Sequence, residues 1–394
     1  MVTTPGALKQ SSLRSFNLSL VLGHVLAQKE PCSRADVAVA TGMTRSTVSR
    51  LVDELVEHGL LAELAPLTGQ RGRPAVPLVA AQGTMVALGL EANVSRLVAR
   101  AVDLSGRVVA ERLVPGQFAN SDADQVVGQL ARLANECLAD LPTGSRHVGT
   151  QLAVAGLVDG ERGLVLRAPN LGWSQVDVPQ AFTHHGFNAA DPPRVANEAD
   201  CAALTVAQSA PGKSSDLDQF LYISGEVGIG CAAVFGGEVM TGRHGWAGEL
   251  GHVCVDPDGR ACACGARGCL ESYAGLGNLL EIAGLADMDA LLQALGTRER
   301  RAADAVQVAG RALGVATSSA LNLLDVSVVA LGGHLAPLSQ WLTPVLSDEL
   351  SQRVLSAPFE PPTVTTMSLD AGTAATGAAY AVLNRLIANP LMVL

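Results

Sequence analysis

The sequence is poor in aromatic and charged residues and has no long apolar run. Aromatic residues make up 3% and charged residues 16% of the 394 residues, whereas 48% are hydrophobic. The apolar stretches are interrupted by Gly, Asn, Asp or His before about 18 residues, so no transmembrane helix is indicated. Residues 1–9 lack the basic and apolar regions of a secretory leader. We therefore expect a cytoplasmic globular protein of roughly two or three domains without a membrane partner.

Negative charge dominates the chain but not its N-terminal part. The whole sequence has 27 Lys and Arg against 37 Asp and Glu, a formal net charge of −10. Residues 1–80 contain eight of these bases and only six of the acids, so this part is slightly basic. An anionic polymer is therefore expected to bind the N-terminal part alone.

Residues 1–80 are predicted to form a winged helix-turn-helix domain. Apolar residues recur at helical spacing over 13–28, and further helices are predicted over 34–40 and 44–58, the second of which is capped by Thr44. The apolar stripe of the last helix leaves its first turns free to enter the major groove. Hydroxyl groups at a helix N-terminus suit phosphate, and Arg binds guanine through two hydrogen bonds. The DNA-binding candidates there are Thr44, Arg45, Ser46, Thr47, Ser49 and Arg50.

A predicted strand, a basic turn and a second strand follow this helix pair. The apolar runs 60–64 and 75–79 enclose Arg-Gly-Arg-Pro, whose Arg71 and Arg73 are placed to reach a minor groove. Alternatively, the basic segment is a solvated linker and the helix pair only a packing unit. The order of the elements favours DNA binding, with two copies on a palindromic operator in double-stranded DNA.

From residue 84 onward, short apolar runs alternate with helical segments, which predicts a layered α/β domain over 84–394. Three strands of a meander are expected over 85–90, 97–103 and 107–114, and a helix over 123–141. Further strands are expected over 148–154, 220–224 and 326–331.

Three of the eight cysteines lie within one short turn. Cys262, Cys264 and Cys269 are separated by Gly-containing spacers, and His252 precedes them. Three thiolates and one imidazole can surround a tetrahedral zinc ion, and four protein ligands leave no open position, so the zinc would be structural. Two alternatives remain open: the cysteines are reduced thiols in a loop, or Cys254 replaces His252 as the fourth ligand.

Six motifs occur in a specific order along this α/β region. They are Ala-Pro-Asn-Leu-Gly-Trp at 168–173, Asn-Glu-Ala-Asp at 197–200, Ser-Gly-Glu-Val-Gly-Ile-Gly at 224–230, Gly-Glu-Leu-Gly-His at 248–252, the cysteine turn through Glu271, and Leu-Gly-Gly at 331–333. From about Met85 to the C-terminus the chain resembles the ROK family of sugar kinases and transcriptional repressors, and the winged helix in front resembles its repressor branch.

The resemblance implies an actin-like (ribonuclease-H-like) fold of two lobes with a sugar site in the cleft, and a homodimer or higher homo-oligomer. Lobe one would comprise about 84–195 plus 370–394, and lobe two about 196–369. The sugar contacts of the family fall on Asn197, Glu198, Glu249, His252 and Glu271. Carboxylates and an amide suit vicinal hydroxyls, and His252 would bind zinc through one ring nitrogen and face the sugar with the other.

Two departures from the family pattern argue against kinase activity. Where family kinases have an Asp-x-Gly-Gly-Thr hairpin that cradles nucleotide phosphates, this chain has Glu-Ala-Asn-Val-Ser over 91–95. Glu198 stands where those kinases have the Asp that accepts the proton of the attacking hydroxyl. We therefore predict a sugar-responsive repressor rather than an enzyme. The alternatives are a sugar kinase with a DNA-binding head, and a regulator whose vestigial sugar pocket answers to another ligand.

Overall fold

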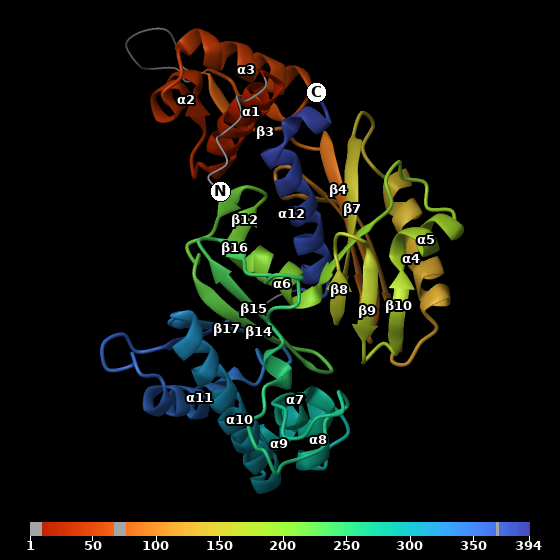
Figure 1. Cartoon of the computed structure of the whole chain (residues 1–394), viewed down its shortest axis with the longest axis vertical. Coiled ribbons are helices and arrows are strands. Elements are labelled where there is room, and N and C mark those ends of the chain that lie inside the picture. Colours follow the sequence, from red (N-terminus) through yellow and green to blue (C-terminus); the bar gives the residue numbers. More distant parts are fainter. Residues whose placement is uncertain (1–9, 67–75, 368–369) are drawn as a thin grey trace, which may run out of the picture.

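The computed structural model describes residues 10–66, 76–367 and 370–394. It consists of an N-terminal head of helices with a small sheet, followed by two α/β lobes, each built on a five-stranded sheet (Figure 1). This arrangement confirms the predicted fold class. Within the described residues, we find no helix with both the length and the apolar character needed to span a bilayer.

The head contains the three predicted helices and the two predicted strands. Ser33 and Asp36 form a capping box at the start of the second helix, and the Thr44 hydroxyl accepts the N–H of Thr47 at the start of the third. A further strand, β1, was not predicted and pairs with β3, giving the sheet order β1-β3-β2. The elements are α1 (Gln10–Ala27), β1 (Cys32–Ser33), α2 (Arg34–Thr41), α3 (Arg45–Glu57), β2 (Leu61–Glu63) and β3 (Pro77–Ala80).

The first lobe contains the predicted meander and helix. Its sheet has the strand order β11-β7-β4-β5-β6, and every residue of the central strand β4 is buried, because helix α4 covers one face and the C-terminal helix α12 the other. The elements are β4 (Met85–Ala92), β5 (Arg96–Asp103), β6 (Val108–Pro115), α4 (Ala123–Ala139), β7 (Arg146–Val154), β8 (Leu157–Asp159), β9 (Leu164–Ala168), β10 (Trp173–Asp177), α5 (Val178–His184), β11 (Arg194–Asn197) and α12 (Thr373–Ala388).

The second lobe has the sheet order β16-β15-β14-β17-β18. Its long helix α10 packs closely on α11, because Gly310 and Gly314 lie directly against the side chains of Val345 and Glu349. Its elements are α6 (Glu198–Ala207), β12 (Gln208–Ala210), β13 (Lys213–Ser214), β14 (Phe220–Gly225), β15 (Ile229–Phe235), β16 (Glu238–Val239), η1 (Leu250–His252), α7 (Glu271–Ala274), α8 (Leu276–Ala283), α9 (Met288–Gly296), α10 (Arg300–Leu324), β17 (Val328–Gly333), α11 (Ser339–Arg353) and β18 (Thr363–Thr366).

The N-terminal head shares its hydrophobic core with the first lobe. Leu18 and Leu22 of α1 belong to the same apolar core as Met85 of β4 and Leu383 of α12. Outside this core, the Ser15 hydroxyl donates to the side chain of Asn389 at 2.9 Å, just after α12. The winged helix is therefore fixed to the first lobe by buried apolar contacts, which transmit movement better than a free linker does.

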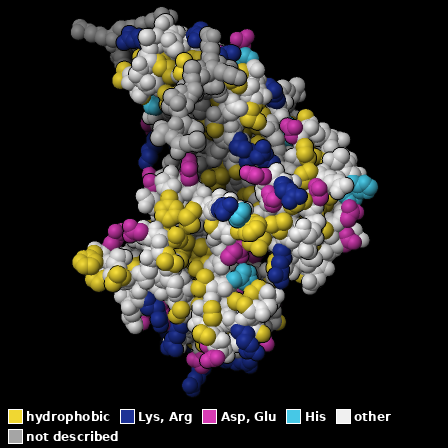
Figure 2. Space-filling view, in the orientation of Figure 1, with side chains coloured by type: hydrophobic (Ala, Val, Ile, Leu, Met, Phe, Trp, Pro, Cys, Tyr) yellow, Lys and Arg dark blue, Asp and Glu magenta, His cyan; other side chains and the backbone are white. Residues whose placement is uncertain are grey.

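One face of the molecule is shown in Figure 2. Basic, acidic and His side chains gather around the middle of the body, where the lobes meet, and apolar side chains gather on the segment between α11 and β18. Leu355 and Phe359 of that segment are 85% and 90% exposed. The middle of the body coincides with a cavity.

Candidate functional site

A cavity of about 260 Å³ lies between the two lobes. It is lined by the turn between β4 and β5, the start of α6, the loop between β14 and β15, and the start of α7. All five predicted sugar contacts line it: Asn197, Glu198, Glu249, His252 and Glu271. Side chains that lie up to about seventy positions apart in the sequence are thus brought to one cavity of a size suited to a small ligand.

The two predicted contacts at the start of α6 already have partners in the chain. Asn197 caps α6 by accepting the N–H groups of Ala199 (2.7 Å) and Asp200 (3.4 Å), and its amide nitrogen donates to the carbonyl of Gly156 (3.1 Å). The role of Asn197 is therefore first to shape the cavity. Glu198 accepts one hydrogen bond, from Asn93 at 2.7 Å, and burial raises its pKa.

The other carboxylates lie on the second lobe. Glu271 accepts the backbone N–H of Ile229 at 3.0 Å, and a side chain at position 228 would collide with it, so Gly228 is needed to make room for this carboxylate. Burial raises the pKa of Glu249, against the opposing effect of His252. The cavity therefore offers several oxygen acceptors, as a polyhydroxylated ligand requires.

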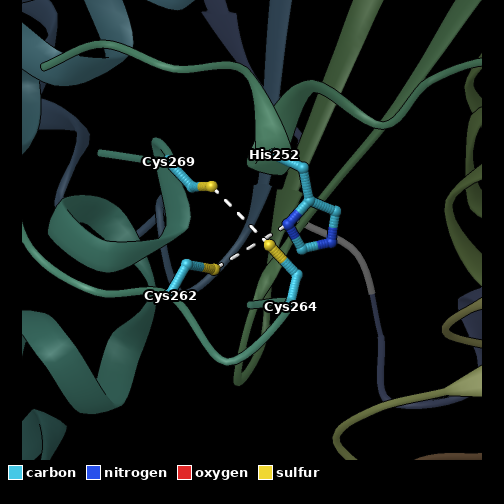
Figure 3. Close-up of side chains that lie close together, drawn as sticks. All are labelled: His252, Cys262, Cys264 and Cys269. Carbon is cyan, nitrogen blue, oxygen red and sulfur yellow. Dashed lines mark hydrogen bonds between the residues drawn. The ribbon is translucent and has the colours of Figure 1, made fainter. Parts of the chain in front are cut away.

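His252, Cys262, Cys264 and Cys269 form a compact group beside the cavity (Figure 3). Their ligand atoms all lie within 4.8 Å of one another, and within the described residues they are the one His, Cys, Asp or Glu group with metal-binding geometry. Cys264 Sγ is 3.8 Å from Cys269 Sγ, and Cys262 Sγ is 4.0 Å from His252 Nδ1. Ligands of a tetrahedral zinc ion are about 3.8 Å apart. These residues could therefore hold a metal ion.

His252 joins this group to the cavity. Its Nδ1 faces the cysteines, and its Nε2 is 3.8 Å from a carboxylate oxygen of Glu249. A hydrogen bond from the Ala266 N–H lowers the pKa of Cys264, which favours the thiolate form that binds metals. Cys254, the alternative fourth ligand, is exposed and is not part of the group.

The DNA-binding candidates differ in exposure. Thr44, Arg45, Ser46 and Arg50 are exposed, whereas Thr47 and Ser49 are only partly exposed. The Ser49 hydroxyl already accepts a hydrogen bond from Arg34 at 2.9 Å. Arg71 and Arg73 lie outside the described residues.

The sequence reasoning missed an ionic network in the cavity. Arg96 Nη2 is 2.7 Å from an oxygen of Glu91, which is completely buried, and the same guanidinium makes two hydrogen bonds to Glu226. The available signal was an acidic residue inside the apolar run of β4, because a buried carboxylate requires a cationic partner. Asp200 was also missed: one of its oxygens is buried without a hydrogen-bond partner among the described residues.

Residues 88–385 match the ROK family, and residues 19–71 match the MarR family. The first match covers about three quarters of the sequence. The chain belongs to the ROK family. This membership confirms the resemblance inferred from the motifs, and the second match agrees with the winged helix of the head.

Several proteins are similar to this ROK protein over most of its length. The putative xylose repressor of Caldicellulosiruptor sp. (strain Rt8B.4) is 28% identical over 81% of this chain and 83% of its own length. A crystal structure of a ROK family transcriptional regulator, a homologue of the E. coli MLC protein, has a TM-score of 0.79 at 24% identity and covers 96% of this chain and 98% of its own.

The body alone also resembles an enzyme. The ROK hexokinase from Thermus thermophilus has a TM-score of 0.62 at 26% identity, covering 78% of this chain and 98% of its own. Fold similarity therefore does not separate regulator from kinase, and the distinction depends on the site residues.

Proposed function

We propose that this ROK protein is a DNA-binding repressor that binds a palindromic operator as a homodimer and responds to a sugar in the cleft between its lobes. The observation that carries the proposal is a winged helix whose core is continuous with the lobe that lines the sugar-sized cavity. A relative named a putative xylose repressor matches 81% of the chain.

The DNA-binding role is assigned to the first turns of α3. Arg45, Ser46 and Arg50 are exposed there, and the Thr44 cap orders the helix end. A helix N-terminus with hydroxyl groups suits a phosphate, and the two guanidinium groups are free to reach bases. Arg71 and Arg73 are proposed to make minor-groove contacts from the wing.

Arg50→Ala is expected to weaken binding to DNA by about 1–3 kcal/mol if Arg50 reads a guanine. The full chain first selects a duplex from a random library, and fluorescence anisotropy then measures its affinity. Arg300→Ala serves as the matched control, because Arg300 is an exposed arginine on the second lobe. Equal affinities of Arg50→Ala and the unmodified chain, with Arg45→Ala also without effect, would contradict this assignment.

The sugar-binding role is assigned to the carboxylates of the cavity. Glu198, Glu249 and Glu271 all line the cavity and present oxygen acceptors there, and the imidazole Nε2 of His252 lies 3.8 Å from a carboxylate oxygen of Glu249. Such groups bind several vicinal hydroxyls at once. Glu198 and Asn197 act partly through the architecture of α6, as their internal hydrogen bonds indicate.

Phosphoryl transfer is disfavoured by the turn between β4 and β5. The N–H of Asn93 donates to Arg96 O, and the N–H of Ser95 donates to the Asn93 side chain, so neither is free to cradle a phosphate. Both terminal nitrogens of Arg96 donate to Glu226, so this guanidinium is not free to bind a phosphate. The kinase-like fold is therefore proposed to serve binding alone.

Sugar binding without ATP turnover is the expected result. Calorimetry with xylose, glucose and N-acetylglucosamine, beside an ATP-consumption assay, separates the candidate functions. Turnover would establish a kinase, and absence of both binding and turnover would favour a vestigial pocket.

Glu249→Gln is expected to weaken the binding of the active sugar at least tenfold, because the neutral amide loses a charge-assisted hydrogen bond. Glu281→Gln, on an exposed side chain outside the cavity, is the control.

The metal group is proposed to hold a structural zinc ion. Three thiolates and one imidazole are ligands that zinc favours, and the observed sulfur-to-sulfur and sulfur-to-nitrogen separations fit tetrahedral coordination. The four side chains fill the coordination sphere, so the ion would order the Cys262–Cys269 turn and the imidazole of His252.

A further inference from the structure

One arginine side chain connects the two lobes across the cavity. Arg96, at the start of β5 in the first lobe, donates from Nη1 and Nη2 to the two oxygens of Glu226, at 3.2 Å and 3.1 Å. Glu226 belongs to the loop between β14 and β15 of the second lobe. Both residues line the cavity, so this two-pronged ion pair fixes the spacing of the lobes there.

A second carboxylate, that of Glu91 in β4, also holds Arg96 in position. The Nη2 of Arg96 is 2.7 Å from Glu91, whose side chain is completely inaccessible. Only 16% of the Arg96 side chain and 33% of the Glu226 side chain are exposed. An ion pair with this degree of burial is screened less by solvent than a surface pair, so it has more influence on the spacing of the lobes.

A second contact connects the same turn to the proposed sugar site. Asn93 donates to Glu198 at 2.7 Å from the turn between β4 and β5, while Asn93 itself is 2% exposed. A sugar hydroxyl that donates to Glu198 therefore meets a carboxylate already bonded to the turn that carries Arg96. Binding of a sugar at Glu198 is therefore expected to change the position of this turn, and a change in the position of the turn is expected to change sugar binding.

The strands that carry this turn extend to the head. At their far ends, Met85 of β4 and Leu104 just after β5 belong to the core that includes Leu18 of α1. The Thr84 hydroxyl also donates to the carbonyl of Gly59, in the head, at 2.6 Å. In Figure 1, β4 lies beside α12 in the first lobe, with one end near the head. A shift of the turn is thus passed along hydrogen-bonded strands to packed side chains of the winged helix.

We propose that the Arg96–Glu226 pair is an interlobe latch that couples the cleft to the DNA-binding head. It holds the lobes at one spacing in the ligand-free chain, and a sugar that changes this spacing breaks or tightens the latch and thereby moves β4 and β5. The regulatory part of this proposal rests on the proposed function, whereas the latch itself does not.

Hydrogen exchange of the full chain, without DNA or sugar, tests the latch. Glu226→Gln removes the charge on the second lobe and is expected to accelerate amide exchange about tenfold in segments 92–96 and 225–228. Glu281→Gln is the matched control: it removes an exposed carboxylate of the second lobe outside the cavity and leaves all contacts of Arg96, so exchange in the two segments should remain within about twofold of the unmodified chain. Unchanged exchange in Glu226→Gln, or equal acceleration in both variants, would overturn the latch.

The coupling is tested by measuring the affinity for DNA with and without sugar. The DNA is the duplex that the unmodified chain selects, and the sugar is whichever of xylose, glucose and N-acetylglucosamine the unmodified chain binds. Glu226→Gln is expected to bring the ratio of DNA affinities with and without that sugar closer to one, while the control Glu281→Gln retains the original ratio. An original ratio in Glu226→Gln would overturn the coupling. If no sugar changes DNA binding by the unmodified chain, the proposed function fails, and the exchange experiment alone decides on the latch.

Discussion

Cys264→Ser is expected to remove the metal ion and to lower the melting temperature by roughly 10 °C or more, because a structural zinc ion contributes several kcal/mol to folding. The unmodified chain should contain about one zinc ion when purified without chelator. Because Cys264 and His252 also line the cavity, the variant should bind sugar more weakly. Metal analysis, calorimetry and thermal unfolding measure the three effects.

Cys254→Ser is the matched control for this experiment. Cys254 is exposed and lies outside the metal group although it pairs with Cys269 in an isolated β-bridge, so its replacement should leave the zinc content unchanged. His252→Ala should lose the metal. Zinc retained by His252→Ala but lost from Cys254→Ser would move the fourth ligand to Cys254, and absence of zinc from the unmodified chain would refute the site.

Asp200→Asn is expected to stabilise the protein at high pH. Burial, with a contribution from Glu249, raises the pKa of Asp200 from 3.8 to about 7. Above pH 4 the unfolded chain has lost this proton, whereas the folded chain retains it until about pH 7, so the free energy of unfolding falls as the pH rises through this window. Between pH 5 and pH 8 the loss from this group is about 2–3 kcal/mol.

An asparagine at this position carries no charge, so the variant should avoid this loss. The stability difference between Asp200→Asn and the unmodified chain should therefore grow by about 2–3 kcal/mol from pH 5 to pH 8 in urea unfolding experiments. Asp304→Asn, on an exposed side chain of α10, is the control and should show no such growth. A difference that stays constant with pH would show that Asp200 ionises normally in the folded protein.

The elements of the head and of the first sheet could be predicted because their signals are local. The apolar stripe of Val48, Leu51, Val52 and Leu55 predicted the third helix, and the cap Thr44 predicted the start of α3. Strand β1 has only two residues, and it pairs with β3, which lies about forty-five positions later in the sequence. No periodicity exists over two residues, so the sequence offered no signal for β1.

The sequence by itself determined the family and indicated the turn of three cysteines, because both depend on residue spacing within short segments. Only the tertiary structure decided how these parts act on one another. In the folded chain, the head shares one core with α12 and β4, and the Ser49 hydroxyl accepts a hydrogen bond from Arg34. Arg96 lies between Glu91 and Glu226. Glu226 lies 130 positions from Arg96. Such a pair forms only when the two lobes meet, because its attraction depends on distance in space and burial rather than on position in the chain.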